Sequence, residues 1–307
     1  MPAVAGWARR AWDHDLAWSF RHSPVALLAA FLTLVCIGGA VLAPWVAPQN
    51  PYDSATLSLS DGFTPPAWTE KGTRKYLLGT DDQGRDVLST ILYGARISLG
   101  VGLASVLFSA LLGVSLGLVS GYLGGRLDAF IMRVADIQLS FPAILIALLI
   151  DGTARIALPR EAHDALALYV LVVAIGLSKW VDYARTVRGS TLVEKGKDYV
   201  QAARVIGRRP LAIMVHHVLP NAMGPVLVIA TINIATAIIT EATLSFLGVG
   251  VPPTQPSLGT LIRVGNDFLI SGEWWISLFP GAALVLLVLA VNLLGDWLRD
   301  ALNPRLR

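Results

Sequence analysis

Long apolar runs alternate along the chain with shorter polar segments. An apolar run of about 20 residues is long enough to cross the hydrocarbon core of a bilayer as an α-helix. Charges interrupt two of these runs, with Arg133 and Asp136 in the third and Lys179 and Asp182 near the end of the fourth. The predicted spans are residues 25–47, 97–122, 129–150, 166–185, 222–249 and 277–297. The pattern predicts an all-α membrane protein with six transmembrane helices.

The polar segments between the spans set the expected organisation. The first long one is rich in Pro, Ser and Asp, which favour turns. Trp274 and Trp275 precede the last span and are predicted to anchor it at the membrane interface. The expected parts are an N-terminal arm at 1–24, a first helix at 25–47, an outer loop at 48–94, a five-helix core at 95–297 with a polar loop at 186–220, and a tail at 298–307.

Composition and charge support this class of protein. Charged residues make up 15% of the chain, against about 25% in a typical soluble domain. If the N-terminus is cytoplasmic, about two thirds of the 24 lysines and arginines fall on the cytoplasmic side, as the positive-inside rule requires. Both termini and the 186–220 loop are then cytoplasmic. The net charge of +3 reflects this topology, and no basic run with interleaved aromatic residues indicates nucleic-acid binding.

The stretch 198–220 is a basic island between two apolar segments. We predict a short helix with Asp198 as its N-cap, Gln201 closing a capping box, and Gly207 ending it. Helical spacing places four residues on one largely apolar face: Tyr199, Ala202, Ala203 and Ile206. A helix of this kind outside the bilayer is suited to docking into a groove of a partner, whereas the simpler alternative is a solvated loop.

The spacing of this island resembles a known motif. Gln201-Ala202-Ala203, Gly207 and Leu219-Pro220 resemble the loop of permease subunits of binding-protein-dependent ABC importers, although Gln201 replaces a Glu and His217 an Ile of that motif. In that family the loop is the coupling helix that sits in a cleft of the ATPase subunit. The resemblance therefore implies an ATPase-docking loop made by Tyr199, Gln201, Ala202, Ala203, Arg204, Ile206, Gly207, Leu219 and Pro220.

Further blocks resemble the dipeptide/oligopeptide branch of this family. They are GTDDQGRDVLSTILYGARISL at 79–99, RVADIQLSFP at 133–142 and the tail from Asn292. The resemblance implies a type I ABC importer permease fold and a translocation path for peptides in a bacterial inner membrane. It also implies the partners: two ABC ATPase subunits, a homologous second permease subunit and an extracytoplasmic solute-binding protein, besides the lipid bilayer.

Small residues in the second span predict close helix packing. Gly113, Gly117 and Gly121 recur at four-residue spacing, which lets two helices approach closely in lipid. Three acids in the preceding block suggest a metal site, but Asp81, Asp82 and Asp86 lack calcium-loop spacing and a later Glu. We therefore expect no metal there.

Three ionisable residues are candidates for the pathway or its gates. Glu241 lies within the fifth span, where an acid usually faces the bundle interior or a water path; the alternative is a shallow position where it caps or pairs. Arg133 and Asp136 are close enough on one helix to pair, and Pro142 is expected to bend that helix near a cytoplasmic gate. An ordinary ion pair within a bundle is the alternative reading.

The chain carries no motif for chemistry of its own. No Gly-x-x-x-x-Gly-Lys-Ser/Thr sequence is present, so ATP binding and hydrolysis are expected in partner subunits. We expect neither a catalytic activity nor a cofactor. The alternative function is an ion-coupled secondary transporter that works without an ATPase, although such carriers often contain inverted repeats, and none is evident here.

Overall fold

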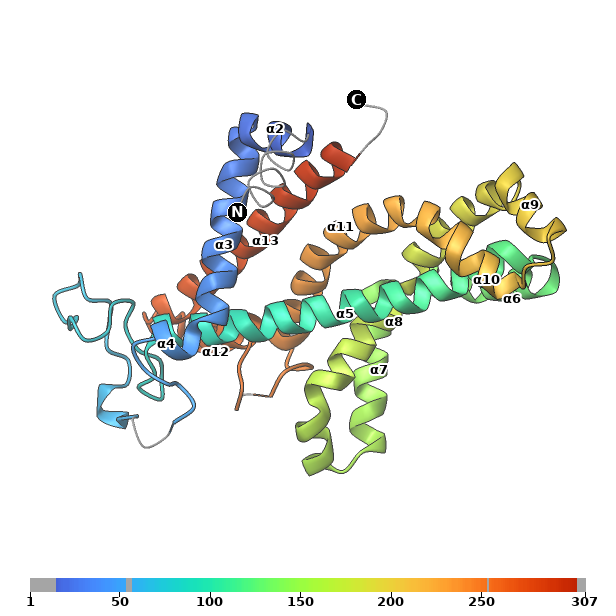
Figure 1. The fold of residues 1–307 in the computed structure, drawn as a ribbon. Helices are drawn as coiled ribbons and strands as arrows, with labels where there is room; N and C mark the ends of the chain where they lie inside the picture. The colour runs from blue at the N-terminus through green and yellow to red at the C-terminus, as the bar shows by residue number, and fades with distance from the viewer. Residues whose placement is uncertain (1–14, 54–56, 253, 303–307) are drawn as a thin grey trace.

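The computed structural model describes residues 15–53, 57–252 and 254–302, and its regular structure in these ranges is helical apart from one isolated bridge between Thr80 and Asp86 (Figure 1). The helices are α2 (Asp15–His22), α3 (Pro24–Val41), α4 (Ala43–Val46), the 3-10 turn η1 (Leu59–Asp61), α5 (Val87–Leu123), α6 (Gly125–Leu139), α7 (Ala143–Ala157), α8 (Arg160–Glu194), α9 (Asp198–Val205), α10 (Pro210–Ile213), the π-helical turn η2 (Met214–Val218), α11 (Leu219–Phe246), α12 (Leu258–Phe268) and α13 (Trp275–Leu302).

Five helical stretches are long and apolar enough to cross a membrane, and the α6–α7 pair makes a sixth if it is counted as one broken span. The five are Pro24–Val41, Val87–Leu123, Leu166–Glu194, Pro210–Phe246 and Trp275–Ala301. The predicted six spans are therefore found only if α6 and α7 together are counted as one span.

The span predicted over 129–150 consists of two helices and not of one bent helix. α6 and α7 meet at 95°, and the break falls at Ser140–Pro142. Pro142 is extended, with φ −56° and ψ 133°. Its ring also restricts the residue before it, which favours an interruption of the helix at this point. The proline thus acts as expected, but it separates two helices instead of bending one.

Other predicted boundaries also shift. α5 begins at Val87, so residues 87–94 belong to a helix and not to the outer loop. α8 continues to Glu194, which shortens the polar loop predicted from residue 186. Of the predicted arm, 1–14 lie outside the described residues, and so do 303–307 of the tail.

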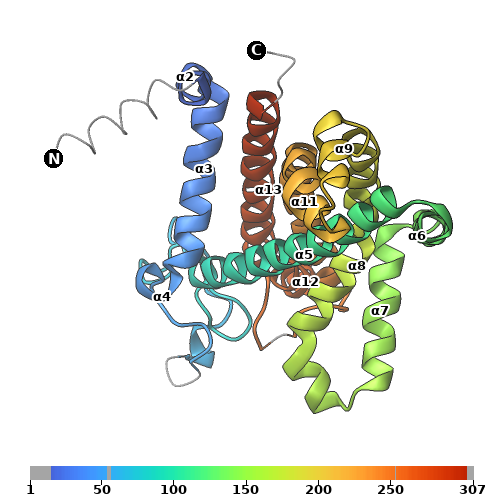
Figure 2. The ribbon, with the colours of Figure 1, turned by 45° about the vertical axis from the view of Figure 1, so that its right-hand side comes forward.

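The most extensive helix–helix packing in the described structure is between α5 and α8, which lie against each other in Figures 1 and 2. Gly113, Gly117 and Gly121 are buried in this contact. A Cβ atom at Gly113 would lie 2.3 Å from the carbonyl oxygen of Trp180, and one at Gly117 would lie 2.4 Å from that of Ala184. Only glycine permits so close an approach of the two backbones.

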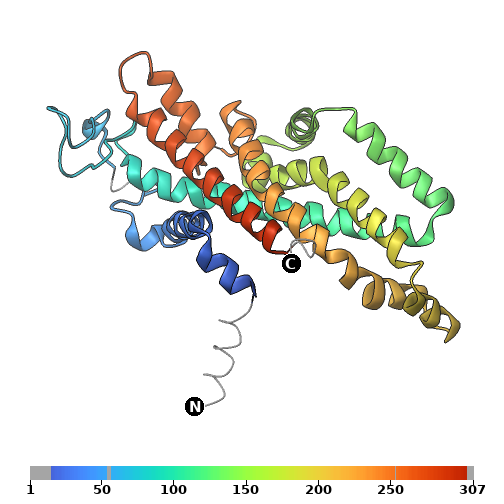
Figure 3. The same cartoon turned by 90° about the horizontal axis from the view of Figure 1, so that it is seen from above.

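A second group of helices packs against the first half of α5. α3 lies beside α13, as Figure 2 shows, and α11 and α12 complete the group. Its apolar core includes Leu99, Ile238 and Leu287. Seen from above, α13 runs across the middle of the molecule between α3 and α11 (Figure 3). The long α5 thereby joins the two helix groups.

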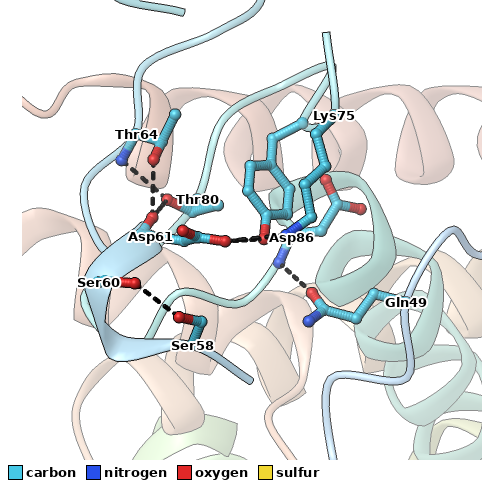
Figure 4. A network of polar contacts seen from close by, with 9 residues as sticks. Gln49, Ser58, Ser60, Asp61, Thr64, Lys75, Thr80 and Asp86 are labelled. Carbon is cyan, nitrogen blue, oxygen red and sulfur yellow. Dashed lines mark hydrogen bonds and ion pairs between the residues drawn. The ribbon is translucent and has the colours of Figure 1, made fainter. Parts of the chain in front are cut away.

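The outer segment before α5 is folded by hydrogen bonds between its own residues (Figure 4). The Asp61 carboxylate accepts from Lys75 Nζ at 2.9 Å and from Tyr76 Oη at 2.6 Å. These two donors hold the pKa of Asp61 below its ordinary value of 3.8, and the hydrogen bond from Tyr76 makes the larger contribution. The Thr80 hydroxyl donates to the Asp61 carbonyl at 2.5 Å. The segment thus has a defined structure outside the spans.

Two further contacts fix this outer segment to the helices. Asp86 is the N-cap of α5, and its carboxylate accepts from the Ser89 amide at 2.8 Å. Trp275 is buried and donates from Nε1 to the Thr80 carbonyl at 3.0 Å. The prediction that Trp275 is an interfacial anchor is therefore wrong, because the indole is used inside the protein to hold the loop.

Candidate functional site

The candidate docking helix α9 lies between the end of α8 and the start of the α10–α11 helix, at one end of the long α5 (Figure 1). Its N-cap is Lys197, which makes no side-chain capping bond. Gln201 Nε2 instead donates to the Lys195 carbonyl at 2.9 Å. The predicted capping box is therefore wrong. Asp198 is the first helical residue instead of the N-cap, and its negative charge there interacts favourably with the helix dipole.

A glycine closes α9 at its other end. Gly207 has φ 75° and donates its amide to the Arg204 carbonyl at 3.0 Å. The Arg208 amide donates to the Ala203 carbonyl at 3.1 Å. This pair of bonds is a Schellman motif, in which the residue with positive φ is usually glycine. The chain can then turn back toward α10.

The faces of α9 differ from the sequence prediction. Val200 and Ala203 are buried, at 0% and 4% exposure, in a core with Val187, Ile213 and Val218. On the other side lie three exposed apolar residues: Ala202, Val205 and Ile206, the last two with 87% and 73% exposure. Ala203 therefore packs inside the chain, and the exposed apolar face lies about one residue further round the helix.

Hydrogen bonds tie α9 to two spanning helices. The Tyr199 hydroxyl donates to the Glu194 carboxylate at the end of α8. Asn221, in the first turn of α11, donates from Nδ2 to the Tyr199 oxygen at 3.1 Å. The hydrogen-bonded Glu194 carboxylate raises the pKa of Tyr199, so its phenol stays protonated. Tyr199 thus links α9 to both α8 and α11.

The remaining residues of the predicted docking loop are arginines near the exposed apolar face of α9 and the residues that begin α11. The Arg204 guanidinium lies over the Tyr122 ring, 5.0 Å from its centroid, while Arg208 and Arg209 are exposed. Leu219 and Pro220 form the first turn of α11, directly after the π-helical turn η2. Pro220 has no amide hydrogen to donate into the preceding turn, and α10, η2 and α11 run on as one stretch.

The predicted pairing of Arg133 with Asp136 is wrong. Asp136 Oδ1 accepts from Arg185 Nη2 of α8 at 2.5 Å. About one turn further along α8, Arg188 binds both carboxylate oxygens of Asp128 at 2.6 and 2.7 Å. Neighbouring helices therefore supply the partners, and these two ion pairs hold α6 against α8.

Glu241 is completely buried inside the helix bundle of the chain. Its carboxylate accepts from the Ser98 hydroxyl of α5 and the Ser245 hydroxyl of α11, both at 2.7 Å. Ser98 Oγ also accepts from the Leu258 amide of α12 at 3.3 Å. In this conformation Glu241 joins three helices, so its expected role at an outer gate remains a hypothesis that would require rearrangement.

Comparison with known proteins identifies the family. Residues 113–307 match the model of the "binding-protein-dependent transport system inner membrane component", and residues 9–66 match that of the "N-terminal TM domain of oligopeptide transport permease C". The chain belongs to this permease family. The family consists of transport permeases and not of enzymes, and it gives no support to the ion-coupled alternative.

Curated relatives resemble the permease over most of its length. The di/tripeptide transport system permease protein DppC of Pseudomonas aeruginosa is 41% identical, covering 94% of this chain and 91% of that relative. The dipeptide permease protein DppC of Haemophilus influenzae is 40% identical, covering 94% and 93%. The oligopeptide permease protein OppC of Bacillus subtilis is 35% identical, covering 95% and 90%.

A solved structure supports the permease fold. A chain of the MetNI methionine ABC transporter, in an inward-facing conformation, has a TM-score of 0.54 at 21% identity and covers 70% of this chain and 96% of its own. The predicted type I ABC importer permease fold is therefore confirmed. A multi-pass protein of the inner membrane follows from the family and from the apolar helices.

Sequence reasoning missed two features of the permease that bear on docking. The predicted docking set lacks Val205, although Val205 is 87% exposed and adjoins the exposed Ile206 in the chain. Spacing from Ala202 at i+3 and i+4 could have found it. The link from Tyr199 to Glu194 and Asn221 had no sequence signal, because it depends on how three helices meet.

Proposed function

We propose that this permease is one of two homologous membrane-spanning subunits of an ATP-driven importer for dipeptides and oligopeptides. The observation that carries the substrate class is the 40–41% identity to permeases named for di- and tripeptides over 94% of the chain. A binding protein on the outer side delivers the peptide, and two ATPase subunits on the cytoplasmic side supply the energy. This chain contributes half of the path and no bond chemistry.

The α9 face is the proposed contact with the ATPase. Its exposed apolar residues Val205 and Ile206 have the character of anchors that fill a partner's pocket. Arg208 and Arg209 beside them are exposed and available for acidic groups at the rim of that pocket. Both termini lie with α9 on the cytoplasmic side in this assignment, in agreement with the distribution of basic residues.

The coupling step follows from the links of α9. ATP-driven closure of the two ATPases displaces the docked helices, and the bonds of Tyr199 carry that displacement to α8 and α11. Because α6 is held to α8 by ion pairs, these helices move as one body. The energy is coupled through the ATPases' different affinity for the inward- and outward-facing states.

Reconstitution tests this function. Proteoliposomes that contain the chain with its ATPase, second permease and binding protein should accumulate a labelled dipeptide only with ATP. Vesicles that contain the chain alone should show no uptake. Uptake by the chain alone, driven by an ion gradient and independent of ATP, would refute the proposal.

A further inference from the structure

Two adjoining hollows lie along the first half of α5. One, of about 400 Å³, is lined by the loop residues Tyr52, Thr254 and Gln255 and by the α5 side. The other, of about 420 Å³, lies between α5 and the first half of α8. Both include Arg96 and Ile97, so they form one groove. We call it the α5–α8 groove.

The groove follows from the path of the two helices. α5 and α8 touch where the glycines pack, and the first half of α8 leaves α5 together with α7 (Figures 1 and 2). Gly100 lies in the opening, where an added Cβ would meet no atom within 4 Å. Ala104 and the exposed Tyr169 also line this second hollow. Each hollow falls within the range of about 300–1,000 Å³ that is usual for small-molecule sites.

Arg96 is the charged residue shared by both hollows. The Arg96 side chain is exposed, and among the residues that the structure describes no hydrogen bond or ion pair holds it. A charge on a membrane-spanning helix normally faces a protein partner or a water-filled cavity, since exposure to lipid is costly. An unpaired arginine that opens onto a groove is a ready site for a carboxylate, which it can bind through two parallel bonds.

Aromatic and amide groups surround this cation. Tyr52 and Tyr93 pack edge to face with ring centroids 5.2 Å apart. Partial burial raises the pKa of Tyr52 to about 12, so its hydroxyl remains a neutral donor. Gln255 and Thr254 add polar groups at the same mouth. The polar lining of this first hollow suits the backbone of a short peptide. The second hollow is lined mostly by apolar residues, among them Val101, Leu168 and Val172, and suits an apolar side chain.

We infer that the α5–α8 groove is a solute-binding site at the outer end of the translocation path, in which Arg96 binds the carboxylate of a peptide. This inference rests on the proposed import function and adds a position and a chemical class of contact to it. The carboxylate in question is the free C-terminus, which every unmodified dipeptide carries. The site orients the solute as it leaves the binding protein.

Charge-selective labelling tests the electrostatic part. Cys36 is the only cysteine, so a Cys36→Ser chain with Gly100→Cys carries one reporter in open space. The assembled importer in zwitterionic vesicles is treated with anionic and cationic methanethiosulfonates of similar size. The ratio of anionic to cationic labelling rates should fall at least about fivefold on Arg96→Gln, because a local charge concentrates counter-ions.

A matched reporter keeps this result interpretable. Ile270 is 99% exposed in the turn between α12 and α13, so Ile270→Cys in the Cys36→Ser chain is a second reporter outside the groove. The labelling ratio at Ile270→Cys should not respond to Arg96→Gln. Failure of aqueous reagents to reach Gly100→Cys, or a ratio there that Arg96→Gln leaves unchanged, would overturn the inference.

Protection by peptides tests the carboxylate. A dipeptide with a free C-terminus should slow labelling of Gly100→Cys, whereas its C-terminal amide should not, and Arg96→Gln should abolish the difference. Equal effects of acid and amide would overturn the inference, even where wild-type vesicles import the peptide. Carboxylate-dependent protection without any ATP-driven uptake would support the site and refute the proposed import.

Discussion

The outer loop before α5 and the α9 docking region are both polar segments between spans, but they are completed in different ways. In the outer loop, charged and polar groups are paired internally: Arg85 and Asp81 form a buried ion pair at 2.6 Å. In α9, the inner face is packed while Val205 and Ile206 remain exposed. The outer loop also exposes apolar side chains, Leu59 at 81% and Trp68 at 60%, but its fold rests on the buried polar pairs. In α9 the packed inner face and the exposed apolar face lie on one short helix.

This difference predicts whether a substitution changes the stability of the chain or its association with a partner. A change in the outer loop should lower the stability of the chain itself, whereas a change on the exposed face of α9 should affect association and leave stability intact. Four predictions, from the largest expected effect to the smallest, can break or sharpen the contrast.

Loss of the Arg85 cation should have the largest effect on folding. Arg85→Leu leaves the Asp81 carboxylate buried without its cation, which typically costs about 3–5 kcal/mol. The thermal midpoint of the detergent-solubilised chain should fall markedly, and the double variant Asp81→Asn/Arg85→Leu should recover part of the loss. An unchanged midpoint for Arg85→Leu would show that the loop is not stabilised in this way.

A charge on the exposed face of α9 should act on binding instead. Ile206→Asp should weaken co-purification with the ATPase by at least about 30-fold, the ~2 kcal/mol of an interface hot spot, with an unchanged thermal midpoint. Ile270, which is 99% exposed in the α12–α13 turn, offers the control Ile270→Asp. Equal loss with both variants would mean that exposure alone, and not the α9 face, explains the result.

Ala203→Asp should behave differently from Ile206→Asp, because Ala203 is buried in the chain's own core. Ala203→Asp should therefore lower the thermal midpoint of the chain. Glycines at helix contacts measure the contribution of packing to stability more cleanly, because their substitution adds no charge. Gly117→Ala forces a methyl group against the α8 backbone, at a cost of about 1–3 kcal/mol. Gly152→Ala of α7 adds the same group in open space. It should not lower the thermal midpoint and should raise it slightly, because alanine is the better helix former.

The smallest effect concerns pH. Because hydrogen bonds from Tyr76 and Lys75 lower the pKa of Asp61, its contribution to stability is present above the unfolded value of about 3.8 and is lost as the pH falls through the folded pKa. The difference in thermal midpoint between wild type and Asp61→Asn should be constant from pH 7 to about 5. It should shrink at more acidic pH, and a difference that grows there would contradict the assignment.

The sequence was informative where one physical property decides the outcome. Apolar length placed the spans, because a bilayer demands about 20 apolar residues of any helix that crosses it. Gly207 marked the end of the docking helix, because a positive φ favours glycine. The spacing of Gly113, Gly117 and Gly121 singled out the α5 surface that packs on α8.

The errors arose where tertiary neighbours decide. Both possible faces of α9 contain apolar residues, and periodicity alone could not tell which one the chain itself would bury. Asp136 had a nearby arginine in sequence, but Arg185 on another helix reaches it. Glu241 accepts a hydrogen bond from Ser245 on its own helix and one from Ser98 on α5. The local sequence could suggest the first partner, but it could not show the second or the enclosure.

The most direct test of the docking claim is photo-cross-linking from position 205. A photoreactive amino acid replaces Val205 in the assembled importer, and mass spectrometry identifies the adduct. The account predicts a cross-link to the ATPase subunit, formed in the complete complex and lost when Ile206→Asp is added. Adducts with lipid or the second permease, and none with the ATPase, would contradict it.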